Sequence, residues 1–490
     1  MSLATTPAIH IPMRRMTVVL ALLLAALAAC APQDAAAKPR VQHLKFRFGP
    51  ISIAPGQNTI SLDGKDVPRP RVPGWIVGFR PNLERSNGSV PGVDVIHLHH
   101  AVWLINGAPT FAAGEEKTKV ALPRGFGWRF RRSDEWVLNH MVHNLLPNRD
   151  RVYLTYEIDF IPASSPLAKG IHEVETRWLD VQGGNAYPVF DVHRGSGRDG
   201  RFTYPNDVPG VYGAGPPLNR LVVRSPGVLV QTAGHLHPGG LYTDLTLTRG
   251  GRRVNLFRSR AKYWEPAGAV SWDVAMTATS PRWRVKVRPG DVLEVSATYD
   301  SKRGSWYESM GIMPVAFAGG APGGVDPFSS KLDRRGRITH GHLPENDNHG
   351  GEAGGLPDAR MLPAGPTPTG PVAISDFLYG LGDLQADATS RPPLVPAGQP
   401  LAFVNRDAAR TIFHTVTSCR APCNRGTGIA YPLADGPVEF DSGELGFGPA
   451  GFTPAANRDT WSTPANLTPG TYNYFCRVHP FMRGAFRVAR

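Results

Sequence analysis

The sequence predicts an all-β protein of several domains. Two turn-forming residues are abundant, with 54 glycines and 47 prolines among 490 residues, and no long amphipathic heptad pattern is present. Short apolar runs alternate with turn signals such as SLDGKD, VRPGD and LTPGT, which is typical of strands joined by tight turns. The chain is long enough for about three domains.

The charge pattern indicates which classes of partner the protein can bind. The formal net charge is +13, and it falls to +11 when Arg14 and Arg15 are removed with the first 29 residues. The basic residues are dispersed and no basic run dominates, so the chain does not read as a nucleic-acid-binding protein. Such a surface suits anionic lipid or an acidic partner protein.

Residues 1–29 have the features of an export signal. Arg14 and Arg15 precede the apolar stretch VVLALLLAALAA, which is too short to span a bilayer by itself. The stretch ends in LAAC, which resembles a bacterial lipobox and implies that Cys30 is the lipidated first residue of the mature chain. An ordinary signal peptide is the alternative, and the match to a twin-arginine signal is poor. We expect an extracytoplasmic lipoprotein, at the cell surface or in the periplasm, with residues 30–44 as its tether.

The four cysteines divide by chemistry. If Cys30 carries lipid, three remain in an oxidising compartment. Cys419 and Cys423 are close enough to pair as a small disulfide loop. Cys476 is then a lone thiol, which would be oxidised unless something such as a metal ion protects it.

The segment YNYFCRVHPFMRGAF places three metal-ligating residues within seven positions: Cys476, His479 and Met482. Two imidazoles and a thiolate with a long axial Met make a blue-copper site, and His414 is the only other His after His349. Zinc accepts Cys and His as well, but it gains little from Met. The sequence therefore predicts copper held by His414, Cys476, His479 and Met482.

The motif CRVHPFMRG resembles the ligand loop of the cupredoxins, and of the amicyanins in particular. The preceding LTPGTYNYFC is similar to the strand that leads into that loop. The resemblance covers about residues 370–490 and implies a Greek-key sandwich with the same four ligands. The segment between His414 and Cys476 is longer than in small cupredoxins, which implies an added loop.

We also expect the far ring edge of His479 to reach the surface, framed by Pro480 and Phe481. Such an apolar patch suits brief docking with a redox partner protein. Packing of Phe481 against its own domain is the alternative.

A second group of histidines lies N-terminal to the predicted copper site, between His97 and His349. A strand would put His235 and His237 on one face, and likewise His97 with His99, while His100 points away unless a bulge redirects it. Four clusters of histidines are hard to explain as core residues, because each imidazole that is buried needs a hydrogen-bond partner or a metal. The clusters are HLHHAVW, NHMVHNLLP, QTAGHLHPGG and THGHLPENDNHGG.

Residues of about 45–325 resemble the two-domain, ascorbate-dependent copper monooxygenases and the stress-up-regulated nodulin-like family. The motifs HHAVWL and MVHN match the first copper site of the monooxygenases, and GHLHPGG with SWYESMGIMPVAF match the second. The resemblance implies two sets of ligands, with Met313 as the fallback for the Met: His99, His100 and His143, then His235, His237 and Met310. The disulfides of those enzymes are missing, because no Cys lies between Cys30 and Cys419.

These resemblances imply two jelly-roll sandwiches, 45–210 and 211–325, and a cupredoxin domain, 371–490. The Gly- and Pro-rich segment 326–370 is expected to be a connector. Its histidines, His340, His342 and His349, are expected to cap the backbone of an ordered loop, with a third metal site as the alternative.

Two functions remain open. The first is a copper oxidoreductase in which the cupredoxin passes single electrons to or from monooxygenase-like copper centres. The second is a non-catalytic copper-binding protein or electron shuttle anchored at the cell surface. The expected partners are a redox protein or a small-molecule electron donor, and the membrane.

Overall fold

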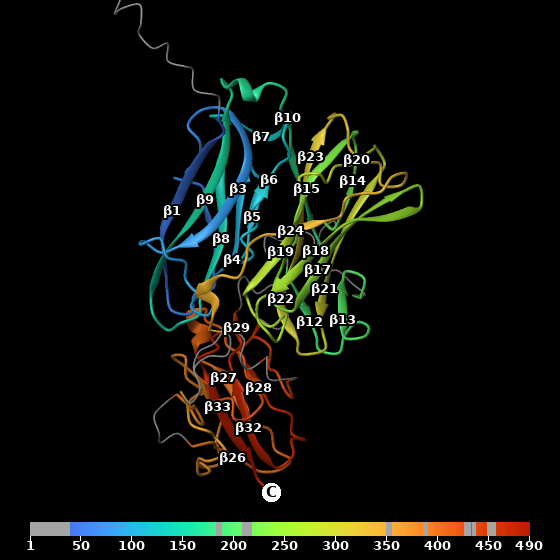
Figure 1. Ribbon diagram of the computed structural model, residues 1–490. Helices are drawn as coiled ribbons and strands as arrows, with labels where there is room; N and C mark the ends of the chain where they lie inside the picture. The colour runs from blue at the N-terminus through green and yellow to red at the C-terminus, as the bar shows by residue number, and fades with distance from the viewer. Residues whose placement is uncertain are drawn as a thin grey trace, which may run out of the picture. The chain divides into compact units, whose positions relative to one another are not determined.

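The computed structural model describes residues 40–182, 189–207, 218–348, 355–385, 391–425, 433, 438–447 and 457–490. The expected leader and Cys30 lie outside these residues. The regular structure described is almost all strand, so the predicted all-β class is confirmed (Figure 1). Among the described residues, three short 3-10 turns accompany the strands: η1 (Pro166–Ala168), η2 (Pro344–Asn346) and η3 (Asp407–Arg410). In the described part of the chain, no helix has the length and apolarity needed to cross a bilayer.

The first module, residues 42–173, is a sandwich of two sheets. One sheet contains β1 (Gln42–Ile53), β9 (Asp150–Pro162), β3 (Gly74–Glu84), β7 (Phe126–Phe130) and β10 (His172–Glu173), with β6 (Val120–Ala121) paired to β3. The other contains β2 (Ile60–Asp63), β8 (Trp136–Asn144), β4 (Ile96–Ile105) and β5 (Ala108–Ala113). Strand β1 begins inside the expected tether, because its residues pair with β9 from Gln42 onward.

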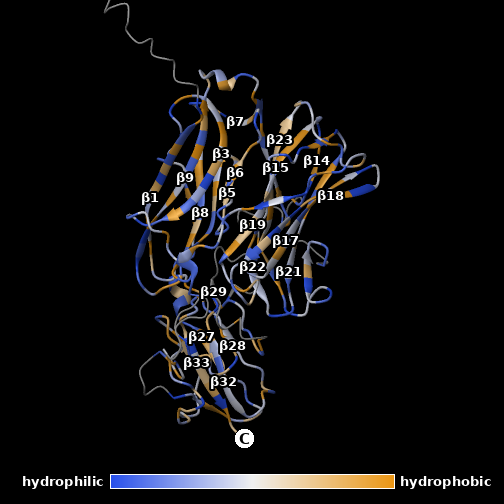
Figure 2. Ribbon diagram, viewed as in Figure 1, coloured by the Kyte–Doolittle hydropathy of each residue, from blue (hydrophilic) through white to orange (hydrophobic). Residues whose placement is uncertain are grey.

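Alternation along the strands builds the core of this sandwich. Residues of β3 alternate between buried and half-buried, and Figure 2 shows apolar and polar segments alternating along the strands of this module. Phe79 of β3 stacks on Phe111 of β5 at 4.4 Å between ring centroids, and it meets Trp103 of β4 at 4.9 Å. The aromatic core therefore joins the two sheets.

The second module, residues 175–338, has two larger sheets and one strand pair. The first sheet contains β11 (Glu175–Asp180), β23 (Gly311–Gly319), β15 (Gly227–Thr232) and β20 (Val285–Val287), with β16 (His235–Leu236) paired to β23. The second contains β13 (Arg201–Tyr204), β21 (Val292–Asp300), β17 (Gly240–Arg249), β18 (Arg252–Tyr263), β19 (Val274–Thr279) and β24 (Gly336–Ile338), with β14 (Arg220–Val222) paired to β21. The pair is β12 (Phe190–Val192) with β22 (Trp306–Ser309).

Two domain boundaries differ from those that the sequence predicted. Strands β11 to β13 pair with β23, β22 and β21, so the second module begins at Glu175 and not near residue 211. The expected connector also contributes β24, which pairs with β19. Turn signals mark loops, but strand partners are set by residues far away in the chain, and the sequence pattern does not reveal them.

The third module, residues 372–488, is a smaller sandwich. Its three-stranded sheet contains β25 (Val372–Ile374), β27 (Ala402–Asn405) and β31 (Thr460–Ser462). Its four-stranded sheet contains β26 (Leu394–Val395), β33 (Arg483–Val488), β32 (Gly470–Phe475) and β28 (Thr417–Cys419). A further pair joins β29 (Gly446–Phe447) and β30 (Asn457–Arg458).

Candidate metal centre

A tight turn between β32 and β33 carries three of the four ligands predicted in the third module. Cys476 directly follows β32, His479 lies in the turn, and Met482 directly precedes β33. The backbone closes this turn, because the Met482 N–H donates to the His479 carbonyl at 2.9 Å. His414 comes from the segment between η3 and β28, where its backbone exchanges hydrogen bonds with Leu445.

The structure brings His414, Cys476 and His479 together. Cys476 Sγ lies 3.8 Å from Nδ1 of each histidine, and the two Nδ1 atoms are 3.1 Å apart. This triangle leaves room for an ion about 2.0–2.3 Å from each ligand atom, the usual range for metal–nitrogen and metal–sulfur bonds. All three side chains and Met482 are fully buried. Among the described His, Cys, Asp and Glu residues, this is the only group whose ligand atoms all lie within 4.8 Å of one another.

The surroundings of Cys476 favour its thiolate form. Its Sγ accepts hydrogen bonds from the backbone N–H groups of Thr415, at 3.4 Å, and His479, at 3.3 Å. Burial alone would raise the pKa of this thiol, but His414 and the two N–H groups together hold the pKa below its usual value. The thiolate is the form that binds a metal ion.

Asp407 orients His414, a role that the sequence did not reveal. Its Oδ2 accepts from His414 Nε2 at 2.9 Å, which directs Nδ1 toward the site. Burial would raise the pKa of this carboxyl, but the His414 contact and the backbone N–H of Asp376 hold its pKa well below the usual range. The only sequence signal was an acidic residue seven positions before the histidine.

The outer edge of His479 is buried, so the expectation of an exposed edge is wrong. His479 has no exposed surface, and its ring centroid lies 5.9 Å from that of His143 on β8. The turn at Gly56, with φ +59°, covers the same edge: a Cβ there would lie 3.0 Å from His479 Nε2. Pro480 is also buried, and Phe481 is half-buried against its own module. The ligands of this loop are close together in the sequence, whereas the residues that cover His479 belong to the first module: Gly56 and His143.

A β-bulge on β4 gathers the histidines of the first module. His97 pairs with His143, whereas His100 pairs with Met141, so three steps on β4 match two steps on β8. His99 is the extra residue. Because paired residues share a face, His97 and His100 both lie on the face that carries His143. The structure therefore contains the bulge that His100 needs in order to lie on the same face of β4 as His97.

These histidines divide between two cavities. Four of them, which we call the junction histidines, line a small cavity of about 130 Å³ together with Trp272: His97, His99, His143 and His237. The ring centroids of His97 and His143 are 4.8 Å apart, and those of His99 and His237 are 4.4 Å apart. His97 also stacks on Trp272 at 4.2 Å.

The other cavity, of about 550 Å³, is lined by His100, His235 and Met310 among others. Met313, the fallback ligand, instead lies in the core of the second module. Each predicted front triad is therefore divided between the two cavities, and both triads stay predictions.

Five of the histidines that line the two cavities are held as neutral rings: His97, His99, His100, His143 and His237. Burial, with neighbouring imidazoles, lowers the pKa of His97, His99 and His237 well below the ordinary value. Burial lowers the pKa of His143 to about 3 and that of His100 to about 4. Neutral imidazole is the metal-binding form.

Two histidines of the connector, His340 and His342, contact groups of their own loop and of β19. His340 contacts the Gly341 carbonyl at 2.6 Å and the Val274 carbonyl at 3.2 Å, and His342 contacts Asp347 at 2.7 Å. This arrangement fits the loop interpretation rather than a third metal site. His349 lies outside the described residues.

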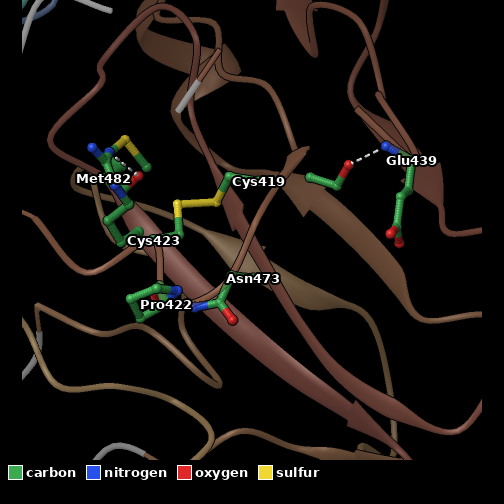
Figure 3. The surroundings of a disulfide bond; sticks show 8 residues. Cys419, Pro422, Cys423, Glu439, Asn473 and Met482 are labelled. Atoms are coloured by element: carbon green, nitrogen blue, oxygen red, sulfur yellow. Dashed lines mark hydrogen bonds between the residues drawn. A yellow bond between two sulfur atoms is a disulfide. The ribbon is translucent and has the colours of Figure 1, made fainter. Parts of the chain in front are cut away.

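The structure contains a disulfide between Cys419 and Cys423, and Met482 of the candidate metal centre lies in its surroundings (Figure 3). Asn473 of β32 donates to the Pro422 carbonyl at 2.9 Å and so fixes the small loop to the sheet. Among the described cysteines, Cys476 alone has a free thiol, and it is buried.

Comparisons with known proteins add little. No family model and no curated protein matches the chain. Solved structures with some likeness include Sulfolobus turreted icosahedral virus, with a TM-score of 0.28 and 8% identity over 57% of this chain and 91% of that one. A copper-containing nitrite reductase from Thermus scotoductus has a TM-score of 0.16 and 16% identity over 55% of this chain and 59% of that one. These scores are too low to support an argument about function.

Proposed function

We propose that the chain is an extracytoplasmic copper protein whose third module transfers single electrons. His414, Cys476 and His479 bind the ion in this proposal, and Met482 is the weak axial ligand. Copper supplies a reversible one-electron couple at such a site. The buried thioether supports copper over zinc, because zinc gains little from Met.

The observation that carries the proposal is the burial of the His479 edge. In cupredoxin-like sites a ligand histidine is expected to be the contact for electrons, and here that ring meets His143 of the same chain at 5.9 Å between centroids. Gly56 allows the first module to approach His479 Nε2 closely, because any side chain at this position would fill the gap. We infer that electrons pass between the third module and the front histidines within one chain.

In this proposal the first two modules hold the copper centres that exchange electrons with the third module. Buried ring nitrogens without a hydrogen-bond partner are costly, by about 1–3 kcal/mol each. Both nitrogens of His97 are in this position, as is Nε2 of His143, His235 and His237. A bound metal would satisfy one nitrogen of each of these rings, which supports a copper oxidoreductase with monooxygenase-like centres.

A shuttle or copper-binding protein with a single centre is the second candidate. Its support is specific: of the described residues, only His414, Cys476 and His479 already have three ligand atoms within 4.8 Å of one another. In that case the front histidines would not bind copper. Export and lipid anchoring at Cys30 belong to either candidate and rest on the sequence.

Copper stoichiometry with visible and electron-paramagnetic-resonance spectra tests the proposal. The oxidoreductase predicts about three coppers per chain of two spectral kinds, and the single-centre candidate predicts one blue copper. In Cys476→Ser the blue centre should be lost, while any front copper remains. A chain that binds copper without an intense visible band would contradict the proposed centre.

A further inference from the structure

Most of the net positive charge of the chain lies in two segments of the second module. Residues 249–288 and 331–337 carry fourteen Lys and Arg against three acids, an excess of eleven in a chain whose formal net charge is +13. Two of the three acids, Glu265 and Asp273, are buried. Cations that look dispersed along the sequence therefore dominate the surface of these two segments.

Strand β18 directs its cations outward. It carries five Lys and Arg and no acid among its twelve residues. Arg260 lies opposite Thr277 of β19, and Thr277 pairs with Ile338 of β24. Because residues that lie opposite one another share a face, Arg260 and Ile338 are on the same face of the sheet. Arg258 and Lys262, each two positions from Arg260, alternate onto that face as well.

The segment that leads into β24 brings further cations to β18. Arg334 Nε donates to the backbone carbonyl of Asn255 on β18 at 2.8 Å. Arg335 pairs with Asp333 at 2.9 Å, and Arg282 lies 3.9 Å from the same carboxylate. We call the whole set of cations the basic edge: Arg253, Arg258, Arg260, Lys262, Arg282, Lys331, Arg334, Arg335 and Arg337.

Carboxylates neutralise only part of the basic edge. Three of them form ion pairs with it: Asp244, Glu294 and Asp333. Five of the nine cations form no ion pair with a carboxylate of the described residues, and all five are exposed: Arg260, Lys262, Lys331, Arg334 and Arg337. The surface therefore keeps an excess of positive charge that faces solvent.

Protection of a sheet edge does not explain this arrangement. β24 is the last strand of its sheet, where cations prevent pairing with another chain. β18 lies between β17 and β19, so its backbone is already paired and its outward cations protect no edge. Ile338 is 43% exposed on the face that carries Arg260. Clustered cations beside an open apolar side chain are typical of surfaces that lie against an anionic bilayer.

We propose that the basic edge is a membrane-docking surface. Its cations bind the headgroups of anionic phospholipids, and Ile338 enters the boundary between headgroups and acyl chains. The lipid expected at Cys30 would bring this surface to a bilayer, which favours a membrane over a soluble acidic protein. Because salt screens such contacts, the basic edge orients an anchored chain and does not hold it on the membrane alone. Docking requires no metal ion, so it is independent of the copper centres.

The test uses the full chain with Cys30→Ser, so that no lipid anchor contributes, and vesicles of phosphatidylcholine with or without phosphatidylglycerol. At low ionic strength the protein should sediment only with the vesicles that contain phosphatidylglycerol, and added salt should release it. Each cation near an anionic surface contributes roughly fivefold in affinity. Arg260→Glu with Lys262→Glu should therefore weaken vesicle binding at least about tenfold.

A matched control has the same change in net charge elsewhere. Lys65 and Arg71 are exposed in the first module, so Lys65→Glu with Arg71→Glu should leave vesicle binding unchanged. Absence of binding that depends on phosphatidylglycerol, or equal binding by the two charge-reversed variants, would overturn the proposal.

Ile338→Ser separates a bilayer from a soluble acidic partner. Loss of an apolar side chain that enters the bilayer should weaken vesicle binding severalfold. Val72→Ser is the matched control, because Val72 is 49% exposed in the first module, and it should bind vesicles without loss. An Ile338→Ser variant that binds like Val72→Ser would indicate a purely electrostatic surface, suited to an acidic protein, and would also overturn the proposal.

Discussion

Asp407→Asn tests how the metal centre is held. Oδ2 of Asp407 accepts from His414 Nε2 at 2.9 Å and from the Phe377 N–H at 3.2 Å. Oδ1 accepts from the Asp376 N–H at 2.9 Å and from the Arg410 guanidinium. An amide has one acceptor oxygen, so either pair of donors loses its partner in the variant.

The magnitude follows from this geometry. If the amide NH₂ faces His414, the ring proton is favoured on Nδ1, which removes the lone pair that would bind the ion. Loss of such an orienting partner typically costs 10–100-fold in metal affinity, or about 1.4–2.7 kcal/mol. The Phe377 N–H would then face the amide NH₂ without an acceptor, which would lower the free energy of unfolding by about 1–3 kcal/mol.

Copper affinity is measured by competition with a chromogenic copper(I) chelator, and stability by urea unfolding. Asp376→Asn is the matched control: Asp376 belongs to the same cluster and pairs with Arg410, but its side chain is 77% exposed and does not contact His414. Asp407→Asn with the affinity and stability of the wild type would refute the orienting role.

Three further predictions concern other parts of the chain. Replacing Cys419 and Cys423 by Ser should lower the free energy of unfolding by about 2 kcal/mol, the loop-closure value for so short a loop, and equal urea midpoints would contradict this. Gly56→Ala should separate the modules near His479, so that the reduced protein is reoxidised severalfold faster by hexacyanoferrate(III) with an unchanged visible spectrum. Gly88→Ala is its control, since Gly88 also has a positive φ but nothing within 4 Å of a Cβ, and equal rates in both variants would argue against the cover. Cys30→Ser should release the protein from membranes, and membrane association that persists would exclude the lipid anchor.

The sequence predicted what depends on neighbouring residues. Cys476, His479 and Met482 lie on one turn, so their spacing alone indicates a ligand set, and the structure places the first two with His414.

Features that depend on distant residues were not predicted. The cover over His479 comes from Gly56 and His143, and the division of the front histidines depends on the bulge at His99 and on the packing of two modules. Glu116 and Trp272 lie in no recognisable motif, although Glu116 contacts His235 and Trp272 contacts His237. The early start of the second module at β11 depends on pairing with β23, which no local pattern reveals.

The most direct test of the central claim is a copper titration of the full chain, followed by visible absorption, with Cys476→Ser beside the wild type. A blue-copper centre predicts an intense visible band that saturates at one copper per Cys476 and is absent from Cys476→Ser. Met482→Gln should keep the band and lower the reduction potential. A wild-type chain that shows no such band on copper addition, or a Cys476→Ser variant that retains it, would contradict the account.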